Sequence, residues 1–423
     1  MRLAISLLLL MLIGLFVNCG KKSSHSSKKA GLTKDGKILI TIWQTYNDEE
    51  VAFFDQLIAE YERENVHIKI KHQRIPFWGS EPKILTALAT RTTPDIARLD
   101  VSFVAKLGLR NALIDLGPLG MNEIAADYLP AALGSCKIKK SWFAIPEQVN
   151  GLCLFYDKDQ FIKAGLNPEN PPLTWEEFIE YGKKLTAPDR SHWGFGMRNS
   201  LWWSFPFFYT FGAEFLSDPT PDGHRICLLD QPEAIQAFQF KYDLYHKYKI
   251  EGGAWRSGGI RDDTGFPNVY AMVFSGPWAV RSYREQKINF GICKIPAGPA
   301  GSSTTVGGQN MVIFRTCQHP QETFDLLRWL TSVEIQARWC NELGQIPVNY
   351  KAYPLIDKEK NPEISIFMEQ MKTAIPRPQI LNYDHIENLF LREMEAALTG
   401  SKSVEQAMQD ACRRANEEYL NEE

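Results

Sequence analysis

The first part of the chain alternates between short β-type runs and helical stripes of apolar residues. A β-rich run at 37–43 is followed by a helical stripe at 51–61, an alternating strand pattern at 66–70, a second helical stripe at 84–88 and a short strand at 95–99. This β-α-β-α-β order predicts a parallel sheet with right-handed crossovers. Ligands of such sheets bind in the crevice beyond the carboxyl ends of the strands. We therefore expect a ligand site near the side chains that follow these strands or precede the next helix, which are Trp43, Phe77, Trp78 and Asp100.

The pattern continues through the rest of the chain and becomes helical towards its end. Further strands are predicted at 152–156, 271–275, 289–295 and 306–314. Helices are predicted at 174–185, where Thr174 to Glu177 forms a capping box, at 321–332 and at 404–411. A length of 423 residues fits two or three domains, or one α/β fold in two lobes.

The N-terminal residues have the pattern of a processing signal. Residues 3–17 form an almost unbroken apolar run that is too short to span a bilayer, which predicts a signal peptide over 1–18. Cys19 ends this run and precedes a polar, Ser/Lys-rich stretch that predicts a flexible tether over 19–36. A Cys in this position is typical of lipoproteins, so we expect Cys19 to carry a lipid that anchors an exported protein to the membrane, facing the periplasm or the cell exterior. The alternative is an uncleaved signal in which Cys19 is incidental.

Composition narrows the possible partners. Hydrophobic residues make up 44% and charged residues 23%, which is ordinary for a globular protein and excludes disorder as the dominant state. Lys and Arg total 47 against 50 Asp and Glu, so the chain lacks the basic surplus typical of nucleic-acid binders. Seven other cysteines are scattered without a C-x-x-C motif, which signals neither a zinc ribbon nor a redox pair and leaves their connectivity open.

Sequence motifs of catalysis are missing. The chain has no Walker A motif, no G-x-G-x-x-G, no H-E-x-x-H and no G-x-S-x-G. We therefore expect no enzyme, no cofactor and no metal site. A glycoside hydrolase that uses two of the many carboxylates stays open as a less favoured alternative.

Several aromatic and polar residues together suit a sugar, which presents apolar C–H faces and a rim of hydroxyls. The stretch 193–211 interleaves Trp202 and Trp203 with polar side chains, and Gly276-Pro277-Trp278 places another Trp after a strand. The Gly-rich run 307–310 would let a ligand approach backbone amides. Each feature also has a purely structural explanation. The stretch 193–211 could be a core helix of aromatic residues, Trp278 a buried Trp at a corner of the chain, and the run 307–310 a tight turn.

Several sequence pieces follow one another between about residue 37 and the C-terminus. They are ITIWQTYNDEE, TPDIARLD, AIPEQVNGLCLFYDKDQFIKAGL, PPLTWEEF, VFSGPWAV, FGICKIPAGP, VGGQNMVIF and GQIPV. In these pieces and in their order, the chain resembles the family 1 extracellular solute-binding proteins, the sugar-capturing subunits of ABC importers.

The resemblance implies a periplasmic-binding-protein-like α/β fold of two lobes, each a mostly parallel sheet flanked by helices, with further helices at the C-terminus. Lobe one would comprise 37–147 plus 306–360, and lobe two 148–305 plus 361–423. The chain would cross between them near 146–149, near 303–306 and around 361. A carbohydrate would be clamped between the hinged lobes of a monomer, and an ABC transporter permease would receive it.

The resemblance also implies individual binding residues. Trp278 matches the family's stacking aromatic, and Asp100 matches an acid that takes sugar hydroxyls in maltodextrin binders. Asn150 stands where those binders carry Glu. Asp384 lies in the inter-lobe segment 374–384 and is equally suited to cap a helix. The candidate ligand-binding residues are Trp43, Asp100, Asn150, Trp202, Trp203, Trp278, Gly308, Gln309 and Asp384.

The expected function is capture of a sugar or oligosaccharide for an ABC importer. A binding protein for another solute would share the fold and differ in its pocket. A polyamine site would be rich in carboxylates, an iron site in Tyr and His, and a sugar phosphate site in Lys and Arg.

Overall fold

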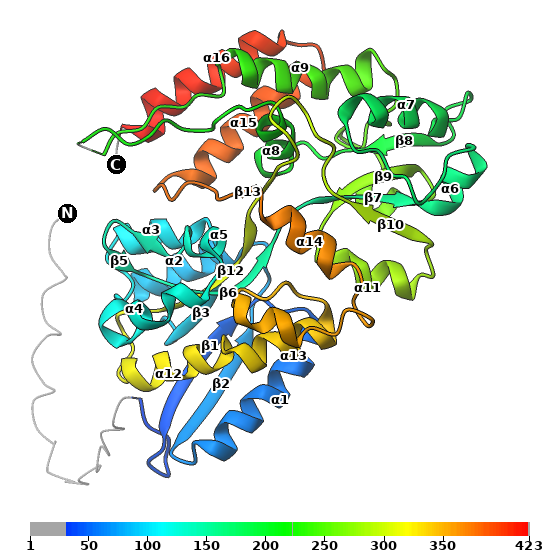
Figure 1. Ribbon diagram of the computed structural model, residues 1–423. Coiled ribbons are helices and arrows are strands. Elements are labelled where there is room, and N and C mark those ends of the chain that lie inside the picture. Colours follow the sequence, from blue (N-terminus) through cyan, green and yellow to red (C-terminus); the bar gives the residue numbers. More distant parts are fainter. Residues whose placement is uncertain (1–30, 222, 422–423) are drawn as a thin grey trace, which may run out of the picture.

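The computed structural model describes residues 31–221 and 223–421 and shows a two-lobed α/β protein (Figure 1). Each lobe contains one larger β-sheet flanked by helices, and the chain passes several times between the lobes near the centre of the molecule. The predicted signal peptide over 1–18 and the predicted lipid site at Cys19 lie outside the described residues.

The sheet of the first lobe has five strands in the order β2-β1-β3-β12-β6. Strands β1 (Ile38–Gln44), β2 (Ile68–Arg74) and β3 (Ile96–Asp100) pair in parallel, as the β-α-β-α-β pattern predicts. Strand β12 (Gly307–Ile313) runs antiparallel to β3 and to β6 (Ile145–Asn150). The carboxyl ends of β1 and β3 therefore share one edge of the sheet.

Helix α1 (Asp48–Glu64) shows how local sequence sets these elements. The Asn47 side chain accepts hydrogen bonds from the backbone of Glu49 and Glu50, and the Glu50 carboxylate accepts one from the Asn47 N–H at 2.8 Å. This capping box satisfies amides that would otherwise lack partners at the start of the helix. The helix buries Phe54 and Leu57 against the sheet.

The remaining elements of this lobe cover the sheet or connect its strands. They are α2 (Ser80–Thr90), α3 (Phe103–Leu109), α4 (Met121–Ile124), α5 (Pro130–Leu133), β4 (Lys137–Ile138), β5 (Ser141–Trp142), α12 (Pro320–Leu330) and α13 (Val333–Leu343).

The sheet of the second lobe has four strands in the order β10-β7-β9-β8. Strand β7 (Cys153–Asp157) runs antiparallel to both β10 (Phe290–Cys293) and β9 (Tyr270–Ser275), and only β8 (Trp193–Gly196) and β9 pair in parallel. The expectation of mostly parallel sheets is therefore wrong, because both sheets are mixed. Strand β7 enters directly from β6 of the other lobe, and this entry sets its direction against both neighbours.

Helices surround the second sheet and form the C-terminal part of the chain, as predicted (Figure 1). They are α6 (Lys158–Lys163), α7 (Trp175–Leu185), α8 (Leu201–Thr210), α9 (Pro232–His246), α10 (Asp262–Gly265), α11 (Pro277–Glu285), α14 (Ile364–Met371), α15 (Tyr383–Leu398) and α16 (Val404–Ala415).

Three passages of the chain lie side by side between the lobes. The link from β6 to β7 is fixed by Thr304 Oγ1, which accepts a hydrogen bond from the Leu152 N–H at 3.1 Å. Thr304 belongs to β11 (Thr304–Thr305), which pairs in parallel with β13 (Ala374–Ile375). The exact lobe boundaries remain a prediction. The predicted boundary between residues 147 and 148 falls inside β6, and this strand lies wholly in the first sheet.

Residues 31–36, at the end of the predicted tether, are ordered against the first strand. The Thr33 N–H donates to the Lys37 carbonyl at 2.8 Å, and Leu32 forms an antiparallel bridge with Ile38. The predicted flexible stretch 19–36 is therefore shorter at this end, because these hydrogen bonds fold its last residues into a turn. Within the described part of the chain, no helix has the length and apolarity needed to cross a membrane.

We expect Asn47→Ala to lower the free energy of unfolding by about 1 kcal/mol, because two amide groups at the start of α1 lose their acceptor. Urea denaturation measures the effect. Ser332→Ala is the matched control: Ser332 occupies the same position before α13, yet its side chain makes no capping hydrogen bond. Equal losses in the two variants would contradict the role given to the capping box.

Candidate ligand-binding site

Three tryptophans gather where helices α8 and α11 begin, and we call them the tryptophan cluster. The ring centroids of Trp202 and Trp203 lie 5.1 Å apart, and those of Trp202 and Trp278 lie 6.1 Å apart. Trp278 stays 48% exposed, which is unusual for so large an apolar side chain. The sequence placed all three residues in one site, and the structure brings them together.

Local sequence explains how these rings are presented. Ser200 caps α8 by accepting a hydrogen bond from the Trp203 N–H, and Pro277 opens α11 one residue before Trp278. The Arg198 guanidinium lies 4.2 Å from the Trp203 ring centroid and is held by Asp262 and Asp263, each at 2.6 Å. The two carboxylates neutralise this arginine, so the edge of the cluster is polar without a net positive charge.

A pair of opposite charges joins β3 of the first lobe to the segment before α15. Arg377 Nη2 donates to Asp100 Oδ1 at 2.8 Å, and the same oxygen accepts from the Ser102 N–H at 2.9 Å and from its hydroxyl at 2.6 Å. The Arg377 side chain is buried and lies over the Tyr383 ring, 5.4 Å from its centroid. Asp100, a predicted binding residue, therefore faces a cation from the other lobe.

A second inter-lobe pair lies nearby. Lys106 of α3 donates to Asp384 of α15 at 2.6 Å, so Asp384 engages an ion pair in addition to its place in the first turn of the helix. Burial, followed by the nearby Asp384 carboxylate, raises the pKa of Glu81 to about 7. A carboxyl group in such surroundings can donate or accept a hydrogen bond near neutral pH.

Trp202 connects the tryptophan cluster to this charged region. The Trp202 backbone N–H donates to Glu387 Oε1 of α15 at 3.4 Å, and burial raises the pKa of that carboxyl although Arg377 opposes the shift. A Cβ atom added at Gly307 would lie 2.9 Å from Trp202 Cζ2 and 2.4 Å from Asn150 Oδ1. The predicted residue Asn150 is thus next to Trp202 at the crossing between lobes.

Several buried polar atoms around this region lack a hydrogen-bond partner among the described residues. They include Trp202 Nε1, Arg377 Nε, Asn199 Oδ1 and Gln379 Oε1. Buried polar groups in folded proteins are nearly always satisfied. These atoms are covered by protein in this conformation, so a ligand with hydroxyl groups would pair with them only after the surrounding side chains move.

Phe77 and Trp78 form an exposed aromatic pair on the first lobe. Their rings meet edge to face at 5.2 Å in the loop between β2 and α2, and Trp78 is 85% exposed. Glu81 follows three residues later in α2, so the loop leads directly to the charged region. An exposed ring here gives the first lobe an apolar surface of its own.

Two predicted residues, Gly308 and Gln309, have structural contacts in β12. Gln309 Oε1 accepts from Arg98 at 3.0 Å, and Arg98 is buried in an ion pair with Glu147 at 2.7 Å. Gly308 has a φ of 133°, and a Cβ atom there would lie 2.1 Å from the Gln148 carbonyl oxygen. Close packing against β6 therefore explains this glycine without a ligand.

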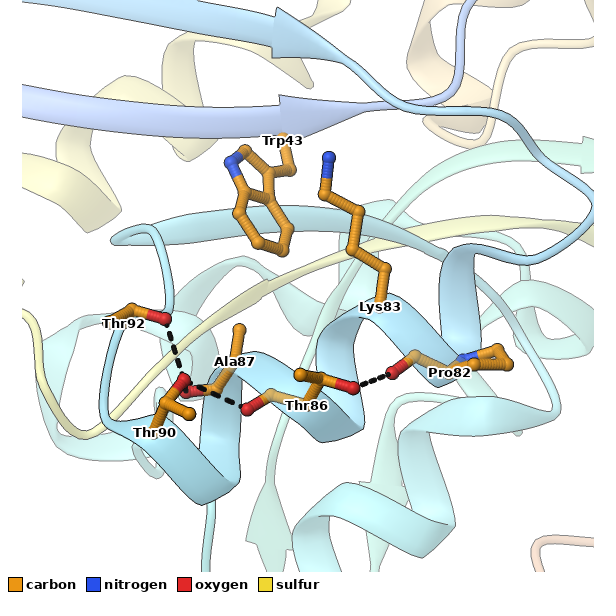
Figure 2. A pocket seen from close by; sticks show the side chains of 7 residues that line it. All are labelled: Trp43, Pro82, Lys83, Thr86, Ala87, Thr90 and Thr92. Carbon is orange, nitrogen blue, oxygen red and sulfur yellow. Dashed lines mark hydrogen bonds between the residues drawn. The ribbon is translucent and has the colours of Figure 1, made fainter.

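Trp43, also predicted to bind ligand, lies in a separate surface pocket of about 370 Å³ (Figure 2). Its ring faces the Lys83 ammonium, which is 4.7 Å from the centroid. The hydroxyls of Thr86 and Thr90 bond to backbone carbonyls of the same helix. The pocket shares no lining residue with the tryptophan cluster, and its threonine hydroxyls already have partners.

Four charged residues of the site were not identified from the sequence: Glu81, Lys106, Arg377 and Glu387. Arg377 stands between Pro376 and Pro378 inside the segment 374–384 that the sequence analysis singled out, so the signal was present there. Glu81 and Glu387 lie on helices with a mixed pattern, where a charged residue is usually solvent-facing, whereas Lys106 is the one charged residue of the almost wholly buried helix α3. In the part of the chain that the structure describes, no group of three or more His, Cys, Asp or Glu side chains is arranged to hold a metal ion.

Comparison with known proteins gives one family. The family model described as bacterial extracellular solute-binding protein matches residues 47–337. Among individual relatives, the sn-glycerol-3-phosphate-binding periplasmic protein UgpB of Escherichia coli is 25% identical over 413 residues, covering 89% of this chain and 92% of the relative.

Solved structures share the fold at lower identity. The cyclic α-maltosyl-1,6-maltose binding protein of Arthrobacter globiformis superposes with a TM-score of 0.79 at 23% identity, covering 90% of this chain and 99% of that one. The sugar-binding protein MalE of Xanthomonas citri gives a TM-score of 0.77 at 23% identity, covering 90% of this chain and 96% of that one. The predicted two-lobed fold is thereby confirmed.

The pKa of Glu81 predicts a dependence of stability on pH. Its folded value of about 7 exceeds the usual 4.5, so between these values the folded protein holds a proton that the unfolded chain has released. Stability is therefore lost as pH rises through about 7. We expect Glu81→Gln to raise the melting temperature relative to the unmodified protein more at about pH 8 than at about pH 5. The exposed Glu123→Gln serves as the control, and parallel pH profiles for Glu81→Gln and the unmodified protein would contradict the assignment.

Proposed function

The chain belongs to the bacterial extracellular solute-binding protein family, and we propose that its solute is a sugar or oligosaccharide held between the two lobes. Membership of a family of binding proteins agrees with the expectation that the chain is not an enzyme. The observation that carries the proposal is the tryptophan cluster, with Trp278 half exposed beside unpaired buried polar atoms.

Each part of the site suits one part of a carbohydrate. The Trp278 and Trp202 rings offer flat apolar faces for the C–H face of a sugar ring. Asp100, Asn150 and Glu387 offer oxygen acceptors around the rim. The Trp202 indole N–H and Arg377 Nε are unpaired but buried donors, which a ligand would reach only if the side chains around them move on binding. A hydroxyl buried without a partner costs about 1–3 kcal/mol, so this polar set also selects the ligand.

Binding at this site favours closure of the lobes. Asp100 comes from the first lobe, while the tryptophan cluster and Arg377 come from the second, so a ligand that contacts both is held best when they approach. Such a ligand shifts the equilibrium by the difference between its affinities for the closed and open forms. Closure by a hinge is the known behaviour of periplasmic binding proteins.

A second candidate ligand is a phosphorylated polyol or sugar. The arrangement that favours it is the buried Arg377, whose Nε has no partner among the described residues, with Lys106 in the same charged region. UgpB, a relative over most of the chain, is named for binding sn-glycerol 3-phosphate. Against this candidate, Asp100 and Asp384 already engage both cations, which leaves little net positive charge for a phosphate.

The wider role that we propose is delivery of the captured solute to an ABC transporter permease. A solved structure with this fold is that of an ABC transporter solute-binding protein from Thermotoga lettingae, which supports the assignment. The chain would act as a monomer after export, anchored to the membrane through a lipid on Cys19.

A thermal-shift screen with matched pairs tests the ligand class. Glucose is compared with glucose 6-phosphate, glycerol with glycerol 3-phosphate, and maltose with maltotriose. A ligand at a hundredfold excess over its Kd stabilises the folded state by about 2.7 kcal/mol. We expect neutral sugars to raise the melting temperature and to compact the particle in small-angle scattering. Stabilisation by the phosphorylated members alone would overturn the sugar proposal in favour of the second candidate.

Trp278→Ala is expected to weaken binding of the stabilising sugar at least about tenfold, which corresponds to about 1.4 kcal/mol of lost stacking. Titration calorimetry gives the Kd, and a cooperative melting curve confirms that the variant is folded. Trp43→Ala is the comparison variant, because its pocket shares no lining residue with the tryptophan cluster. An unchanged Kd in Trp278→Ala would remove the cluster from the binding site.

A further inference from the structure

Two of the seven described cysteines differ from the others in their surroundings. All seven are buried, but the sulfur atoms of Cys227 and Cys412 lie 2.7 Å apart. Within 31–221 and 223–421, no other two cysteine sulfurs lie within hydrogen-bonding reach of each other. The sulfur atoms of Cys136, Cys293 and Cys317 have oxygen atoms as hydrogen-bond partners instead.

The backbone holds both cysteines in place from two sides. The Cys227 N–H donates to Asn416 Oδ1 at 2.8 Å, which ties its segment to the residue that follows α16. Cys227 also forms an antiparallel bridge with Leu216, while Cys412 lies in the last turn of α16. The backbone positions of the two cysteines are therefore fixed by contacts from three separate parts of the chain, which keep the two side chains close together.

We propose that Cys227 and Cys412 form a disulfide bond in the exported protein. The family is extracellular, and the compartments outside the cytoplasm are where protein disulfides form and persist. The oxidant is a disulfide-containing donor. One thiolate attacks the donor disulfide and releases one donor thiol, and the second thiolate then attacks this mixed disulfide and releases the other. The two cysteines lose two electrons and two protons in total, and the donor disulfide is reduced to two thiols.

The bond would join two parts of the second lobe that are far apart in sequence. Cys227 lies between α8, which carries Trp202, and α9, whereas Cys412 lies 185 residues later on α16. Helix α16 packs against α15, which carries Asp384 and Glu387. The cross-link would thus connect the tryptophan side of the site to its charged side through the body of one lobe. This inference is independent of the identity of the solute.

Peptide mapping tests the proposal directly. The full chain is purified from the extracytoplasmic space of a bacterial host, alkylated while denatured, and digested with trypsin without a reductant. Cys227 falls in the tryptic peptide 226–241 and Cys412 in 403–413, each with a single cysteine. We expect these two peptides as one linked species, lighter by two hydrogen atoms than their sum, that separates on reduction. Alkylation of both cysteines in the exported protein, or a link from either to a different cysteine, would overturn the proposal.

Variants give an independent readout. In Cys153→Ser the link should remain, because the Cys153 sulfur lies within hydrogen-bonding reach of neither Cys227 nor Cys412, whereas Cys412→Ser should leave Cys227 open to alkylation. A phosphine reductant should lower the melting temperature of the unmodified protein by about 5 °C or more and leave that of the double variant Cys227→Ser/Cys412→Ser unchanged. Equal sensitivity of the two proteins to the reductant would contradict the bond.

Discussion

A guanidinium that is removed from water needs a counter-charge, and Arg377 finds its counter-charge on the other lobe. Asp100 ends β3 in the first sheet, and Arg377 precedes α15 of the second lobe. Leaving either partner buried alone would cost several kcal/mol, so the pair favours one relation between the lobes. The polar side of the site exists because this contact holds β3 and the 377–384 segment together.

The site divides its chemistry between rigid elements of both lobes. The indoles stand at the starts of α8 and α11, where Ser200 and Pro277 set the backbone, and the carboxylates stand at a strand end and on α15. Arg377 and the pair Phe77 and Trp78 lie in loops, whereas the indole and carboxylate surface of the proposed site is largely preformed. A preformed surface of this kind lowers the entropic cost of binding.

Much of this architecture is encoded locally, and those parts were predictable. The helical stripe at 51–61 predicted α1, and the order of strands and helices predicted the parallel part of the first sheet. Strand direction in the second sheet was not predictable, because β7 obtains its neighbours β9 and β10 from more than 100 residues away in the chain. Trp43 shows a second limit. Trp43 lies near the carboxyl end of β1, and a strand residue points to one face of the sheet or the other. The sequence did not reveal that the Trp43 ring points to the face that α2 covers. The pairing of Arg377 with Asp100, 277 residues apart, likewise has no local signature.

The side-by-side passages between the lobes restrict how the molecule can change shape. Strands β11 and β13 share a ladder, and the Leu152 amide is bonded to Thr304 beside it. If one lobe slid past the other, these hydrogen bonds would break. If the lobes instead rotated about a hinge, the β11–β13 pair would bend as a unit and the bonds would stay intact. Hinge bending about this ladder is therefore the change of shape that its hydrogen bonds permit, and the proposed solute, whatever its length, would be enclosed by that same movement.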